Sequence, residues 1–78
     1  MIECRMKTFD IRDGEINDVH DAGRFKVERF VTSDILKTLT ETDMIYQGTY
    51  LAVQETESEI TFKNPKTGRP MFGVEVLQ

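Results

Sequence analysis

The hydrophobic pattern changes its period once, near the middle of the chain, and this change limits the fold more than any other feature. Residues 24–31 (RFKVERFV) alternate between apolar and polar side chains, as a half-buried strand does. Residues 32–42 instead carry Ile35, Leu36 and Leu39 at the spacing of one helical face. We therefore predict a strand followed directly by a helix of two to three turns, set among segments that are otherwise extended.

The segment before this strand predicts a β-hairpin. Residues 2–11 alternate imperfectly, which indicates a first strand with a bulge near Lys7. The Asp-Gly pair at 13–14 is a strong signal for a tight type I′ turn between two strands. Such a turn places Arg12 opposite Glu15, where the two side chains can form a cross-strand ion pair.

The other segments alternate between extended patterns and turns. We predict, in order, a short arm at 16–19, a turn at 20–23, a long strand at 44–54, a turn at 55–58, a strand at 59–63 and a last strand at 71–78. Pro70 lacks a backbone N–H, which favours an edge position for the last strand. The predicted fold class is α+β: an antiparallel sheet of four to five strands with one short helix, in the order β(β)β-α-β-β-β. A small half-open β-barrel plugged by the helix is the alternative.

Length and charge restrict the class of protein. A chain of 78 residues has room for one core, so we predict a single domain over residues 1–78. Such a core leaves only about 3–5 kcal/mol of stability, and homodimerisation is one way to add to it. The net charge of −4 argues against general nucleic-acid binding. Cys4 has no disulfide partner, and no apolar export signal or membrane segment is present, so we predict a cytosolic protein.

Candidate catalytic groups are few. His20 lies between Asp18 and Asp21, but a general base or a metal site needs further partners, and the acidic loop pattern of a calcium site is not matched. Cys4 alternates with Ile2 on an apolar strand face, where thiols are usually unreactive. We therefore predict no enzymatic activity, no cofactor and no metal.

Residues 62–70 (FKNPKTGRP) combine turn chemistry with positive charge. Asn64, Pro65 and Gly68 are the residue types that a tight turn requires. The same loop carries three cations: Lys63, Lys66 and Arg69. We predict that these cations either contact a partner or are simply solvated.

The predicted strand at 44–54 supplies a second candidate surface. Tyr46 and Tyr50 share one side of it, whereas Leu51 and Val53 on the other side are expected in the core. Phe30 can join the two tyrosines from a neighbouring strand, with Met71 and Leu77. Tyrosine and methionine are favoured at protein interfaces. The alternative is that this side is a second core face.

The function predicted from these features is a small non-enzymatic module that binds a larger protein, as an inhibitor or accessory protein of phage or mobile-element type. The partner-binding candidates are Phe30, Tyr46, Tyr50, Lys63, Lys66 and Arg69. A nucleic-acid-binding domain that uses the basic turn and an aromatic sheet face is the alternative. A separate series, Glu55, Glu57 and Glu59, would space carboxylates roughly 6.7 Å apart in a strand, which either imitates a phosphate backbone or only aids solubility.

Overall fold

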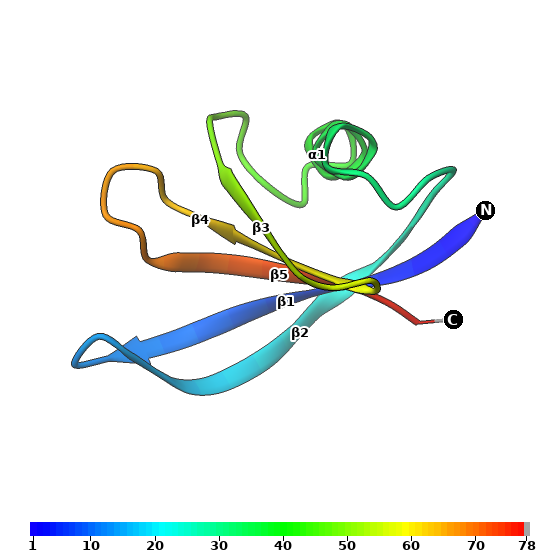
Figure 1. Cartoon of the computed structure of the whole chain (residues 1–78). Coiled ribbons are helices and arrows are strands. Elements are labelled where there is room, and N and C mark those ends of the chain that lie inside the picture. The colour runs from blue at the N-terminus through cyan, green and yellow to red at the C-terminus, as the bar shows by residue number, and fades with distance from the viewer. Residues whose placement is uncertain (78) are drawn as a thin grey trace.

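The computed structural model describes residues 1–77, and they form one antiparallel sheet with one helix against it (Figure 1). The elements are β1 (Ile2–Arg12), β2 (Glu15–Val27), α1 (Thr32–Glu41), β3 (Leu51–Thr56), β4 (Glu59–Lys63) and β5 (Pro70–Val76). Their order across the sheet is β2-β1-β5-β4-β3. The predicted α+β class, with its single helix, is confirmed, and the sheet is open rather than closed into a barrel. No helix in the described chain is long and apolar enough to cross a membrane.

The β1–β2 turn follows the sequence prediction in its backbone. Asp13 and Gly14 both have positive φ, 53° and 79°, as a type I′ turn requires. Arg12 lies opposite Glu15 in the register, as predicted. Its guanidinium, however, pairs with Asp10 at 3.8 Å, so the predicted ion pair is replaced by one along the same strand.

Replacing Gly14 with L-alanine is expected to lower the free energy of unfolding by about 1–2 kcal/mol, because an L residue at this φ brings its Cβ close to the carbonyl oxygen. No described atom lies within 4 Å of the added Cβ, so the effect comes from the backbone alone. Urea unfolding measures it. D-alanine at the same position, introduced by chemical synthesis, is the control, because a D residue favours positive φ. An L-alanine variant as stable as the original would contradict this reason for the glycine.

β2 is a single strand of 13 residues, so the predicted short arm at 16–19 and turn at 20–23 are wrong. The register between β1 and β2 shifts twice, between Met6 and Lys7 and between Asp10 and Ile11, and each shift leaves one extra residue on β2. Because each bulge accommodates one extra residue, the polar residues and the glycine that the sequence suggested were a turn remain part of one continuous strand. The predicted irregularity near Lys7 is thus present, but its extra residue lies on the partner strand.

The strand predicted at 24–31 ends earlier than expected. β2 stops at Val27, and the chain bends before α1 begins at Thr32. Within α1, Ile35 and Leu39 are fully buried, which confirms the predicted apolar face of the helix.

The long strand predicted at 44–54 is also wrong in its first half, because residues 44–50 form a loop and β3 begins at Leu51. The backbone N–H groups of Met44 and Ile45 donate to the carbonyl of Leu39, which turns the chain back beside the end of α1. Both side chains then pack against the core from the loop. Their apolar character therefore reflects burial and not a strand.

β5 lies at the centre of the sheet, between β1 and β4, so the edge position predicted from Pro70 is wrong. Pro70 is the first residue of β5 and lies opposite Lys63 beside a register shift, a position that tolerates a missing N–H. The predicted end of this strand at Gln78 lies outside the described residues.

The core lies between the sheet and α1. Phe62 and Phe72, from neighbouring strands, stack with ring centroids 4.7 Å apart and an interplanar angle of 16°. The buried residues are Cys4, Met6, Phe25, Val27, Ile35, Leu39, Ile60, Phe62, Phe72 and Val74. Leu51, predicted as core, is instead 50 % exposed, because it lies opposite Lys63 on the other face of the sheet.

Candidate functional site

The loop between β4 and β5 is built by the turn residues that the sequence suggested. The side-chain carboxamide of Asn64 accepts hydrogen bonds from the backbone N–H groups of Lys66 (2.8 Å) and Thr67 (3.3 Å). The N–H of Gly68, at φ 73°, donates to the backbone carbonyl of Asn64 at 2.7 Å. The loop backbone therefore holds its own conformation, which leaves the side chains at its tip free for contacts.

The three predicted cations lie together at this end of the sheet. Lys63 is half-buried at the end of β4, whereas Lys66 and Arg69 are exposed on the loop. Within residues 1–77, none of the three forms an ion pair with a carboxylate. Their charge is thus available to an outside group.

The two tyrosines do not lie side by side on a sheet face. Tyr50 is half-buried, and its ring meets Phe72 edge-on with centroids 5.4 Å apart, so it belongs to the margin of the core. Its hydroxyl donates to the backbone carbonyl of Tyr46 at 2.6 Å. The Tyr46 side chain itself is 92 % exposed. Phe30 is also half-buried against the core.

An open hollow of about 350 Å³ joins the two stretches that the sequence had suggested separately. Residues 48–50 form one wall, residues 64–66 form the other, and Met71, which is 43 % exposed, completes it. Tyr50 and Lys66 thus line the same depression. Tyr50, Lys66 and Met71 line this hollow. Together with three residues from the adjoining parts of the same chain segments, they make up what we call the loop-end surface: Tyr46, Tyr50, Lys63, Lys66, Arg69 and Met71.

Comparison with known protein families, curated proteins and solved structures gave no match.

The groups considered for catalysis are poorly placed for it. Cys4 is completely buried, and burial, followed by the negative charge of Glu3, raises the pKa of its thiol. It therefore stays protonated and out of reach of a substrate. His20 projects from β2 into solvent, and its only close carboxylate within residues 1–77 is Asp18, at 3.9 Å. Neither residue meets the other requirements of a catalytic pair.

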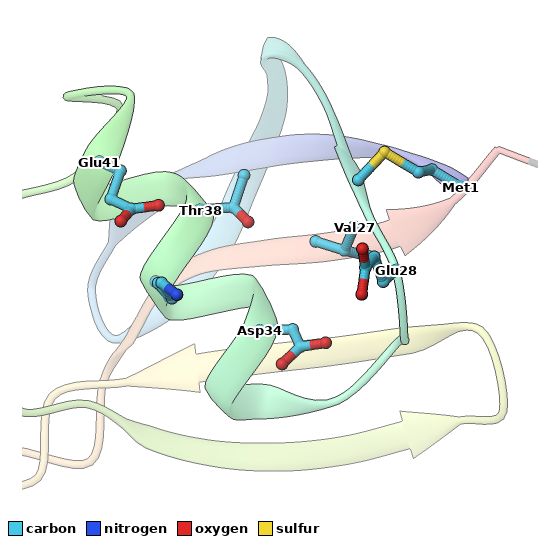
Figure 2. A pocket seen from close by; sticks show the side chains of 7 residues that line it. Met1, Val27, Glu28, Asp34, Thr38 and Glu41 are labelled. Carbon is cyan, nitrogen blue, oxygen red and sulfur yellow. The ribbon is translucent and has the colours of Figure 1, made fainter.

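A second open hollow, of about 380 Å³, lies between α1 and the end of β2 (Figure 2). Glu28 comes from the strand side, and Asp34 and Glu41 come from the helix, with Lys37 among them. The sequence did not indicate this hollow, because its acids come from separate elements. Asp34 already pairs with Arg29 at 3.3 Å. Across residues 1–77, no group of three or more His, Cys, Asp or Glu is arranged to hold a metal ion.

The acids at 55, 57 and 59 do not form one ladder. Thr56 lies opposite Glu59 at the β3–β4 turn, so the three side chains do not follow one strand. The Glu59 carboxylate accepts a hydrogen bond from the ammonium of Lys7 at 3.2 Å. The regular spacing that would imitate a phosphate backbone is therefore lost.

Proposed function

We propose that this chain is a non-enzymatic module that docks on a larger protein through the loop-end surface. The observation that carries this proposal is the hollow in which Tyr50, Met71 and Lys66 lie together. It combines a partly exposed aromatic ring, a flexible thioether side chain and a cation that forms no ion pair within residues 1–77. Aromatic, methionine and arginine side chains are enriched at protein interfaces. The partner surface that fits is apolar at its centre and acidic at its rim.

Two features favour a protein over a nucleic acid as the partner. Base stacking needs an open aromatic face, and Tyr50 already packs against Phe72 and is held by its hydroxyl, which leaves only Tyr46 fully exposed. The molecule also carries a net charge of −4, which disfavours binding of a polyanion. An accessory or inhibitory role in the cytosol, of the kind that small phage or mobile-element proteins have, agrees with the size and with the single buried thiol.

Reversing two charges on the loop is expected to weaken partner capture strongly. We expect the tagged protein to retain one partner from a host lysate in stoichiometric amount, and the Lys66→Glu/Arg69→Glu variant to bind this partner at least about tenfold more weakly. The matched control is Lys26→Glu/Lys37→Glu, which changes the net charge equally at exposed sites elsewhere. Binding is measured by quantitative mass spectrometry and then by calorimetry with the purified partner.

Two outcomes would count against this function. Equal capture by both double variants would show that the loop-end surface is not the docking site. Recovery of nucleic acid instead of a protein, with a gel shift that weakens as salt rises, would favour the nucleic-acid alternative.

A further inference from the structure

The face of the sheet that points away from α1 carries an unusual set of apolar side chains. Phe9 lies on this face, because its ring reaches to 3.1 Å from the position of a Cβ on Gly73, where the ammonium-bearing chain of Lys7 also lies. The register places further apolar residues on the same side: Ile11, Ile16, Val19, Leu51 and Val53. We call this the uncovered face. In Figure 1 the helix lies against the opposite side of the strands.

Several of these side chains are largely open to solvent. Ile16 and Leu51 are each 50 % exposed, and Val19 is 47 % exposed. A solvated face of an antiparallel sheet is ordinarily polar. Single exposed aliphatic residues need no explanation, but a group on one face of a small protein indicates a contact surface.

The charged side chains on this face already neutralise one another. Arg5 pairs with Glu75, and the Lys7 ammonium lies 3.2 Å from a Glu59 oxygen and 3.6 Å from a Glu75 oxygen. The register places further charges of both signs on this face, and cations and carboxylates are nearly equal in number; the further residues are Glu3, Asp21, Arg24, Lys26 and Lys63. The uncovered face is therefore close to neutral, although the whole molecule has a net charge of −4. Two molecules of like charge can approach each other through a neutral face.

We propose that a second copy of the chain covers the uncovered face and forms a two-fold symmetric dimer. A two-fold contact is reciprocal, so the same face must complement itself. An axis parallel to the strands and passing over β5, the middle strand, places β1 of each copy over β4 of the other and β2 over β3. Arg5 then lies over the other copy's Glu59, because both residues are paired with Glu75 in the register. The apolar residues of β2 and β3 pack between the sheets, which stack about 10 Å apart.

The area of the uncovered face is comparable to the area that a dimer interface buries. A stable dimer buries about 800 Å² on each copy, which is about 15 % of the 5383 Å² surface of this chain. The five strands together hold 42 residues, and at about 16 Å² of sheet per residue they span roughly 670 Å², which is close to this requirement. The interface uses neither Lys66 nor Arg69, so it does not depend on the docking function proposed above.

Sedimentation equilibrium of the purified protein over a series of concentrations tests the dimer. We expect the unmodified chain to dimerise and Val19→Asp to raise the dissociation constant about tenfold or more. Leu51→Asp, on a different strand, is expected to act in the same direction. Val31→Asp is the matched control, because Val31 is 39 % exposed at the start of α1, away from this face, and the dimer should be unchanged.

A monomer at all concentrations up to about 1 mM would overturn the proposal, because an interface of standard size binds more tightly than that. A dimer that tolerates both Val19→Asp and Leu51→Asp would overturn it as well, since the contact would then use another surface. Circular dichroism checks that each variant is folded; if Val19→Asp unfolds, Leu51→Asp decides the question. Because only the purified chain is used, failure here is distinct from failure of the lysate experiment.

Discussion

Phe62→Ala is expected to lower the free energy of unfolding by about 3–5 kcal/mol, the largest effect of any single substitution considered for this chain. Phe62 is completely buried on β4 and stacks on Phe72, so truncation leaves a cavity at the centre of the core. A domain of this size has roughly 3–5 kcal/mol of stability in total. We therefore expect the variant to be largely unfolded at 25 °C, with its near-ultraviolet circular dichroism lost.

The matched control for this substitution is Tyr46→Ala. It also removes an aromatic ring, but from a side chain that is 92 % exposed, so its effect should stay within about 0.5 kcal/mol. A Phe62→Ala protein that kept a cooperative transition near that of the control would show that the two rings do not form the centre of the core.

Leu39→Ala is expected to cost about 2–5 kcal/mol. Leu39 is completely buried and, with Ile35, forms the contact of α1 with the sheet. Its backbone carbonyl also accepts hydrogen bonds from the N–H groups of Met44 and Ile45, so displacement of the helix would also displace the following loop. Thermal unfolding measures the loss, and amide hydrogen exchange at residues 44 and 45 should become faster.

Lys37→Ala on the same helix is the control, because Lys37 is exposed and alanine has at least equal helix propensity. We expect its free energy of unfolding to change by no more than about 0.5 kcal/mol. If Leu39→Ala lost stability but residues 44 and 45 exchanged no faster, the loop would be held independently of the helix.

Local patterns accounted for much of the fold. The Asp-Gly turn, the helix with Ile35 and Leu39, and the alternation of Ile60 and Phe62 in β4 each depend on neighbours in sequence, and each is found in the structure. The helix and the number of strands could therefore be predicted from the sequence.

The predictions that were wrong concern segments whose burial or strand pairing depends on residues far away in the sequence. Met44 and Ile45 are apolar because a loop packs them onto the core, and a short apolar run does not distinguish this from a strand. The continuity of β2 depends on two bulges, which place polar residues and Gly23 within a ladder. The central place of β5 depends on pairing with β1, at the other end of the chain.

The candidate surfaces also contain a part that local sequence predicted and a part that only the three-dimensional arrangement shows. Turn chemistry predicted the basic loop, since Asn64 and Gly68 act within a few residues. The separation of Tyr46 from Tyr50, and the hollow that joins Tyr50 to Lys66, arise from how loops 44–50 and 64–69 meet in space. The uncovered face was missed because Val19 and Leu51 belong to opposite edge strands, and only the strand order places them on one side.

The central position of β5 also has a consequence for synthesis of the protein. Within residues 1–77, β1 and β5 are the first and last strands, and β5 alone joins the β1–β2 hairpin to the β3–β4 hairpin. Until the ribosome releases β5, each hairpin has an unpaired inner edge, and two-stranded hairpins are only marginally stable. Folding must therefore follow translation of the last strand, and the open edges are exposed to chaperones or to aggregation until then.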